Sequence, residues 1–206
     1  MRIVNNKIFI ARGETPTYSA SIIDRLTGAP LVIDKGLYEK TDGDKIVNTI
    51  ILEFVVRDSA YSRDDDFRLK YDLLIEQNPD FHLFDSAEIR EYADISGGQN
   101  DFWDDDNVQP EAGYENYLYH RIDNDDNNYY AYYTNGRWKE YSLDFDVTFR
   151  YSETSVMEPK TYKYEVTLLG GALKDNPGPT ETIVDVVYKK PILDLTDFVV
   201  EGSFSG

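Results

Sequence analysis

The chain has 206 residues, enough for one large domain, or one domain with a long insertion, around a sizeable core. It contains no Cys, which excludes a disulfide framework and a thiolate metal site. Its net charge of -18 argues against nucleic acid and anionic membranes as partners. It has neither the run of about 18 apolar residues that a transmembrane helix needs nor an apolar leader, so neither a membrane span nor a signal peptide is expected.

The negative charge is concentrated in the middle of the chain. Residues 60–128 hold 19 Asp and Glu against five Lys and Arg, whereas all other residues together hold 20 acidic and 16 basic side chains. Such a shift in composition marks a change in organisation along the chain. We therefore predict a nearly neutral framework formed by residues 1–59 and 142–206, interrupted by an acidic, Tyr-rich insertion over residues 60–141.

The framework is predicted to consist of strands, because its apolar and polar residues alternate with a period of two. In chain order the predicted strands cover residues 3–11, 18–23, 50–57, 144–151, 160–169, 182–188 and 198–203. Turn signals rich in Gly, Pro and Asp separate them, at residues 27–30, 42–44, 170–171 and 175–179. The strand over 50–57 is apolar on both faces, which is typical of a central position. Short strands at this spacing predict an all-β sandwich.

The insertion has a less regular pattern. Residues 67–75 predict a further strand, and Asp85 with Glu88 predicts the start of one short helix that ends near Tyr92. Residues 94–113 are predicted to form an exposed loop. The dipeptide Asn-Gly at 135–136, between two β-prone stretches, predicts a hairpin over 128–141, because both residues readily take the positive φ angles of a type I′ turn.

Signatures of catalysis are absent from the sequence. The standard motifs for a serine nucleophile, a catalytic zinc, a phosphate-binding loop and a dinucleotide site do not occur. His82 and His120 lack neighbours at metal-ligand or triad spacing, which favours a structural or surface role for both. The sequence therefore predicts that the protein is not an enzyme.

One acidic stretch has the spacing of calcium ligands. Asp123, Asp125 and Asn127 alternate like the first ligands of an EF-hand loop. However, Asn128 and Thr134 stand where that loop needs Gly and a bidentate Glu. An irregular calcium site is one hypothesis for these residues, and a solvated acidic loop is the favoured interpretation.

The aromatic residues of the insertion are unusually concentrated. Eight of the 17 Tyr lie between residues 114 and 141. If one face of the predicted hairpin packs on the framework, the other face exposes its rings, as in a protein interface or a sugar-stacking platform. The candidate interface residues are Tyr129, Tyr130, Tyr132, Tyr133, Trp138 and, in the loop before the hairpin, Trp103.

The two ends of the chain resemble the phage baseplate upper protein family. Residues 6–15 (NKIFIARGET) and 21–30 (SIIDRLTGAP) are similar to the opening of that family, in which a strand leads into an Arg-Gly-Asp/Glu-Thr turn and the next strand ends in an Asp-containing Gly-x-Pro turn. Residues 50–57 are similar to its next core strand, and residues 162–171 and 197–203 to its closing strands. The acidic insertion is far longer than the family's usual connection.

The resemblance implies an immunoglobulin-like sandwich that docks onto other baseplate proteins. It predicts a structural assembly protein of a bacteriophage virion, made in the host cytoplasm and placed in the baseplate, the tail or a tail adaptor, with other virion proteins and copies of itself as partners. The first alternative is a carbohydrate-binding or adhesin-like module, with or without calcium. A DNA-mimicking inhibitor, suggested by the acidic segment alone, has the least support.

Overall fold

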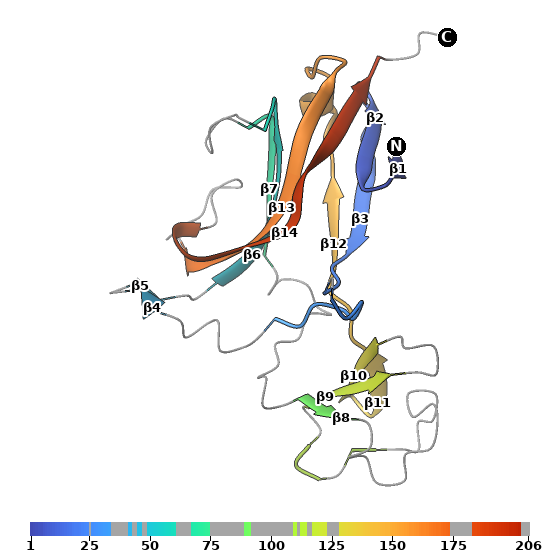
Figure 1. Cartoon of the computed structure of the whole chain (residues 1–206), viewed down its shortest axis with the longest axis vertical. Coiled ribbons are helices and arrows are strands. Elements are labelled where there is room, and N and C mark those ends of the chain that lie inside the picture. The colour runs from blue at the N-terminus through green and yellow to red at the C-terminus, as the bar shows by residue number, and fades with distance from the viewer. Residues whose placement is uncertain are drawn as a thin grey trace. The chain divides into compact units, whose positions relative to one another are not determined.

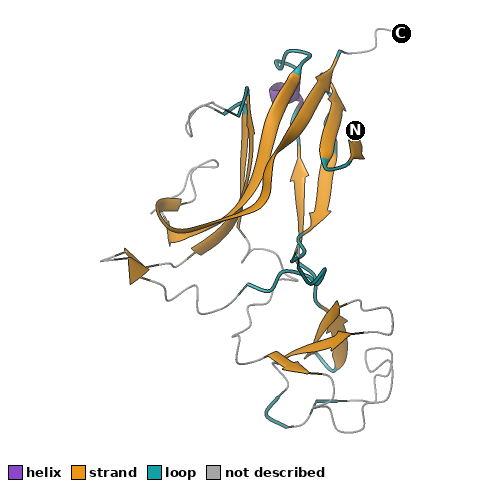
Figure 2. Ribbon diagram, in the orientation of Figure 1, coloured by secondary structure: helices purple, strands orange, loops and turns teal. Residues whose placement is uncertain are grey.

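The computed structural model describes residues 1–24, 26–33, 41–42, 45–46, 49–60, 67–74, 89–91, 109–110, 112–114, 117–122, 128–173 and 183–202. Strands dominate these residues, and the one helix among them is a single turn, so the fold class is all-β. No helix in the described part of the chain is long and apolar enough to cross a membrane. Figure 2 shows how far strands prevail over helix and loop.

The chain forms two compact units. Unit 1 comprises Met1–Ala20, Tyr38–Asp80 and Phe145–Gly206, and unit 2 comprises Ser21–Leu37 and Phe81–Asp144. The predicted boundaries differ from this division in three places. Residues 60–80, expected in the insertion, belong to unit 1, whereas residues 21–37 and 142–144, expected in the framework, belong to unit 2. The two larger differences arise from pairing between segments that are distant in the sequence, which the amino-acid composition cannot indicate.

Unit 1 contains a six-stranded sheet in the order β1-β2-β14-β13-β6-β7. Its strands are β1 (Arg2–Val4), β2 (Lys7–Ala11), β6 (Thr49–Arg57), β7 (Leu69–Leu74), β13 (Thr161–Leu173) and β14 (Ile183–Glu201). Neighbours are antiparallel except β2 and β14, which are parallel. Strand β6 lies between β13 and β7 with both faces buried, which confirms its predicted central position. Figure 1 shows β13 and β14 running together and curving at their far end.

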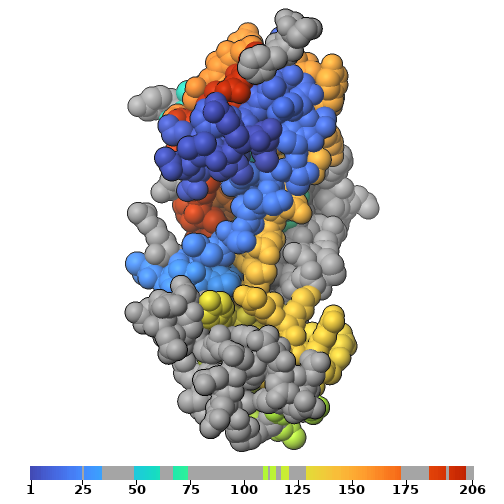
Figure 3. All heavy atoms as spheres, turned by 90° about the vertical axis from the view of Figure 1, so that its right-hand side faces the viewer, coloured from blue at the N-terminus to red at the C-terminus, as the bar shows by residue number. Residues whose placement is uncertain are grey.

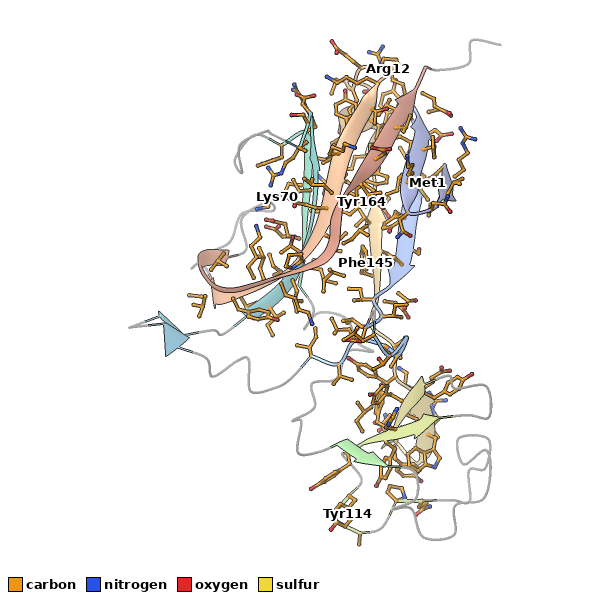
Figure 4. All side chains as sticks on the ribbon, in the orientation of Figure 1. Met1, Arg12, Lys70, Tyr114, Phe145 and Tyr164 are labelled. Carbon is orange, nitrogen blue, oxygen red and sulfur yellow. The ribbon has the colours of Figure 1, made fainter. Side chains whose placement is uncertain are left out.

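A second layer of two strands packs on one face of this sheet. It consists of β3 (Thr17–Ser21) and β12 (Asp144–Thr148). The layers meet through aromatic rings: the Tyr18 ring centroid lies 5.8 Å from that of Phe54, and the Phe149 centroid lies 5.5 Å from that of Phe198. Phe145 and Tyr164, labelled in Figure 4, belong to the same cluster. These rings form the core of unit 1, and each buries far more apolar area than an aliphatic side chain would.

Strand β12 confirms the alternation of buried and exposed residues predicted from the sequence, but it ends at Thr148 and not at residue 151. Phe145, Val147 and Phe149 are buried, while the intervening side chains are exposed. The chain then leaves the extended conformation and forms the single-turn helix α1 (Tyr151–Thr154). Tyr151, expected as the last residue of this strand, is therefore an exposed residue of the helical turn.

Four other local predictions were wrong. The two separate strands expected over 182–188 and 198–203 are instead one continuous strand, β14. The strand expected over 3–11 is the hairpin β1–β2, because Asn5 and Asn6 adopt φ angles of 50° and 62°, and Asn tolerates this left-handed region better than most residues. Residues 170–171, expected as a turn, are paired within β13 to both neighbouring strands. Ile89–Glu91, within the helix expected over 85–92, forms strand β8.

Unit 2 contains a four-stranded sheet in the order β11-β10-β9-β8. The remaining strands of this sheet are β9 (Leu118–Ile122), β10 (Asn128–Thr134) and β11 (Arg137–Glu140). Asn135 and Gly136 have φ angles of 52° and 78°, which confirms the hairpin that they predict. In unit 1, a small ladder of β4 (Thr41–Asp42) and β5 (Lys45–Ile46) flanks the turn expected at 42–44. The loop expected over 94–113 lies mostly outside the described residues.

Candidate functional site

The Tyr-rich hairpin packs on both of its faces. On one face, Trp138 lies against Tyr119 and Tyr133, with ring centroids 5.1 and 5.4 Å apart. On the other face, Tyr132 packs with Leu118. Trp138 is 7% exposed and Tyr132 is 5% exposed, so little of either side chain remains for a partner to contact. The sequence led us to expect one open face, but the sheet instead supplies the core of unit 2.

Three of the candidate tyrosines keep part of their surface. Tyr129, Tyr130 and Tyr133 are half-buried, and the Tyr130 ring stacks on His120 with centroids 4.8 Å apart. His120 therefore sits on β9 as a stacking partner, which fits the structural or surface role predicted for it. A contact between this cluster and a partner stays a prediction, carried by these three tyrosines.

A buried hydroxyl group joins distant segments of unit 2. Tyr141 donates a hydrogen bond of 3.0 Å to the carbonyl oxygen of Leu31, and burial raises the pKa of its phenol. Two backbone hydrogen bonds extend this connection, from Ile22 N to Leu143 O at 2.8 Å and from Leu31 N to Ile22 O at 2.9 Å. Residues 21–37 thus belong to unit 2 through polar contacts that no local sequence pattern indicates.

Several residues that the sequence singled out lie outside the described part of the chain. They are the candidate interface residue Trp103, the candidate calcium ligands Asp123, Asp125 and Asn127, and His82. Among the residues that the structure does describe, no group of three or more His, Asp or Glu side chains is arranged to hold a metal ion. Calcium binding at 123–127 remains an untested hypothesis.

The outer face of the six-stranded sheet carries a series of ion pairs that the sequence did not reveal. Asp197 on β14 pairs with Lys163 on β13 and with Lys7 on β2, the latter at 2.7 Å. Hydrogen bonds from Lys163 and Lys7 hold the pKa of the Asp197 carboxyl below its usual value. Farther along the sheet, Arg57 pairs with Glu165 at 3.1 Å. These charges therefore neutralise one another across neighbouring strands.

The Lys70 end of the same face is also neutralised. Lys70 on β7, labelled in Figure 4, pairs with Glu53 at 2.7 Å and with Asp72 at 3.6 Å. Burial tends to lower the pKa of Lys70, but the bonds to the two carboxylates outweigh it, and the net pKa is raised. The ammonium group therefore stays charged and committed to its partners.

Strand β1 leaves apolar side chains at one edge of the sheet, a surface that we call the β1 edge. Ile3 and Val4 are exposed, and among the described strands β1 pairs only with β2. Arg2 anchors the strand by a 2.8 Å bond to Glu201 and by lying 4.4 Å above the ring centroid of Phe9. In Figure 3 the dark blue atoms of this segment lie at the surface, facing the viewer.

A second apolar surface surrounds the single helical turn, and we call it the α1 end. Tyr151 is 65% exposed and Val156 is 74% exposed. Gly13 approaches the Tyr151 ring so closely that an added Cβ would stand 3.2 Å from Cε2, and its φ of 81° suits glycine. Arg12, labelled in Figure 4, donates from Nε to the Ser155 carbonyl oxygen at 2.7 Å. Specific contacts therefore hold the turn at Arg12 and Gly13 against helix α1.

Comparisons with known proteins identify no relative. No family model matches the chain, and neither the curated proteins nor the solved structures include a match. The functional argument therefore rests on the residues and the geometry described above.

Proposed function

We propose that this chain is a structural assembly protein of a bacteriophage virion, a component of the baseplate, the tail or a tail adaptor that acts by docking to other proteins. The single observation that carries the proposal is the presence of exposed apolar side chains on the β1 edge and the α1 end of unit 1, beside a sheet in which Arg2, Lys7, Arg57 and Lys70 are paired with carboxylates. Apolar surface that is left exposed in groups is typical of protein–protein interfaces.

The turns that carry the resemblance to phage baseplate upper proteins support the same proposal. The Arg-Gly-Glu-Thr segment lies at the α1 end, where Gly13 takes its positive φ angle. In the second motif, the Asp24 carboxylate accepts hydrogen bonds from the backbone of Leu26 and Thr27, at 2.9 and 3.1 Å. Both short motifs quoted from the sequence thus form defined turns at the positions where the resemblance places them.

We further propose that unit 1 is an immunoglobulin-like sandwich. Its support is the packing of β3 and β12 on the six-stranded sheet through buried aromatic rings, which is the face-to-face arrangement of two β-layers. The acidic segment of the chain would then contribute the contacts that are particular to this protein.

Mass spectrometry of virions purified from cells that produce this chain tests the proposal. We expect the chain in the particle at a fixed ratio to other tail proteins. We also expect the double substitution Ile3→Asp and Val156→Asp to remove it from particles, because each places a charge in an apolar contact. The matched control is Leu26→Asp, which places the same charge on an apolar residue of unit 2 that is 95% exposed. Virions that lack the wild-type chain contradict the proposal.

The alternative of a sugar-binding module has less support. Its stacking candidate Trp138 is buried against Tyr119 within unit 2. A glycan array distinguishes the two functions: binding that is lost on Tyr130→Ala, or on removal of calcium, favours the sugar-binding module and counts against a role limited to assembly.

A further inference from the structure

Strand β14 has an edge that is open over most of its length. Strand β13 pairs with it from Ile183 to Val199, whereas β2 pairs with it only from Phe198 to Glu201. Among the described strands, none is bonded to the second side of β14 before Phe198. We call residues 186–195 on this side the β14 edge.

The β14 edge carries two lysines that, within the part of the chain that the structure describes, form no ion pair. The other five Lys and Arg side chains that the structure describes in these six strands each pair with a carboxylate, and they are Arg2, Lys7, Arg57, Lys70 and Lys163. Lys189 and Lys190 are exposed and make no ion pair with any side chain of the described residues. Because the two residues are consecutive on a strand and pair in register with Leu169 and Leu168, their side chains lie on opposite faces of β14. In a chain of net charge -18, positive charges on both sides of an open edge attract carboxylates from outside.

Apolar side chains accompany the two lysines. Val186 is 48% exposed and Leu195 is 41% exposed, and Pro191 is also exposed. A surface of lysines among apolar side chains can combine electrostatic attraction with the burial of apolar area. This combination fits a protein segment better than it fits a small anion.

The same edge is poorly suited to the addition of another strand. The pairing of β13 with β14 shifts register at four places, and Pro191 has no N–H to donate to a new ladder. Bulges, lysines and proline are the features that prevent edge-to-edge pairing in natural sheets. A partner at this edge is therefore bound by side chains and not by an extended ladder.

We propose that the β14 edge binds a second copy of this chain, with Lys189 and Lys190 donating to carboxylates of the acidic segment over residues 60–128. That segment carries 19 acidic against five basic residues, the strongest charge complement to the edge that the sequence contains. The inference rests on the proposed function, since assembly proteins act as multiple copies. A basic edge that meets an acidic segment is a heterologous contact, which generates rings or open chains of subunits.

Sedimentation velocity of the full chain with Lys189→Glu and Lys190→Glu tests the proposal. We expect the wild-type chain to self-associate, and the double variant to do so about tenfold or more weakly, because like charges then face each other across the contact. The control is the pair Arg137→Glu and Arg150→Glu, which changes the net charge equally at exposed positions elsewhere. Far-UV circular dichroism verifies that both variants are folded.

A mixing experiment tests the heterologous geometry. The double variant keeps its own acidic segment, so it should still bind wild-type chains through their β14 edge while failing to bind itself. Raising NaCl from about 0.1 M to about 1 M shortens the Debye length from about 10 Å to about 3 Å, and should weaken the wild-type contact more than any residual contact of the variant.

Three outcomes overturn the inference: a wild-type chain that stays monomeric, a variant that associates as the wild type does, or an equal loss in the control pair. None of them bears on whether the chain is present in virions. Failure of this inference is therefore distinguishable from failure of the proposed function.

Discussion

Phe54 occupies the centre of the aromatic core of unit 1. Its ring centroid lies 5.3 Å from that of Tyr164, 5.8 Å from that of Phe149 and 6.3 Å from that of Tyr71. The side chain is fully buried on the central strand β6. Interactions between such rings add to the free energy gained from burial, so this residue stabilises the layers more than its area alone indicates.

Replacing Phe54 by Ala should lower the free energy of unfolding by about 3–5 kcal/mol, because a cavity remains where four elements meet. Urea denaturation followed by circular dichroism measures the effect. Val156→Ala serves as the control, since this exposed residue should change stability by less than about 0.5 kcal/mol. Equal effects of the two changes would contradict the proposed position of the core.

Buried phenols make the stability sensitive to alkaline pH. Burial raises the pKa of Tyr71, and the neighbouring Glu153 carboxylate raises it further. Burial likewise raises the pKa of Tyr164 and of Tyr141. In the unfolded chain these phenols ionise near pH 10, whereas in the folded protein they stay protonated above it.

We therefore expect stability to be fully present below about pH 10 and to fall as the pH rises toward the folded-state pKa values, because the unfolded chain releases its phenolic protons first. Absorbance at alkaline pH should show one set of tyrosines ionising normally and a second set ionising only with unfolding. Substituting Phe for Tyr71 and Tyr164 should reduce the second set. Simultaneous ionisation of all tyrosines in the folded protein would exclude this account.

At the scale of elements, the β10–β11 hairpin depends on its two-residue turn. Gly136 has a φ of 78°, a conformation that costs an L-residue about 1–2 kcal/mol. We expect Gly136→Ala to destabilise unit 2 by about that amount, measured by thermal denaturation. Gly202→Ala is the matched control, because no other atom lies within 4 Å of the position of its Cβ. A change at Gly136 without effect would show that the turn contributes nothing to the hairpin.

Asp197 holds three neighbouring strands together on the outer face of the sheet. It lies on β14 and pairs with Lys163 on β13 and Lys7 on β2, and these bonds lower its pKa. A lowered pKa contributes stability above the unfolded value of about 3.9, which is lost as the pH falls through the folded value. We expect Asp197→Asn to be destabilising at pH 7 and to differ least from the wild type near pH 2. A constant difference across this range would argue against the ion pairs.

At the scale of the whole molecule, the net charge of -18 opposes compaction. Self-repulsion of this kind destabilises a folded chain and is screened by salt. Raising NaCl from about 0.02 to about 0.2 M should raise Tm by about 2–4 °C, a change equivalent to about 1 kcal/mol in a chain of this size. Differential scanning calorimetry measures it, and a fall in Tm would mean that the ion pairs outweigh the repulsion.

Calcium chloride at the same ionic strength tests the calcium hypothesis. If Asp123, Asp125 and Asn127 hold the ion, Tm should rise beyond the value in NaCl, because a ligand that binds only the folded state stabilises it. The triple substitution to Ser should remove the excess. Identical Tm values in the two salts would favour the solvated loop.

Much of the local structure was predictable from the sequence. Alternation identified β6, β12 and β13, and the Asn135–Gly136 dipeptide identified the hairpin, because side-chain direction and backbone φ depend on neighbouring residues. The sequence also shows directly that motifs for common enzyme chemistry do not occur in it. Asn5-Asn6 is also a turn signal, but the alternation of the residues around it predicts one continuous strand in place of the hairpin.

The tertiary structure decided what depends on distant partners. Charge segregation could not show that β7 joins the sheet of unit 1, or that residues 21–37 join unit 2, since both follow from pairing across the chain. Nor could alternation distinguish an aromatic side chain that faces a partner from one that packs within its own unit. Tyr132 and Trp138 both pack within unit 2. By itself the sequence determined an acidic, all-β protein with one certain hairpin, because those properties are local or compositional. Which faces are covered, which charges are paired and which edges stay open were decided by packing, because burial belongs to the folded arrangement and not to any residue alone.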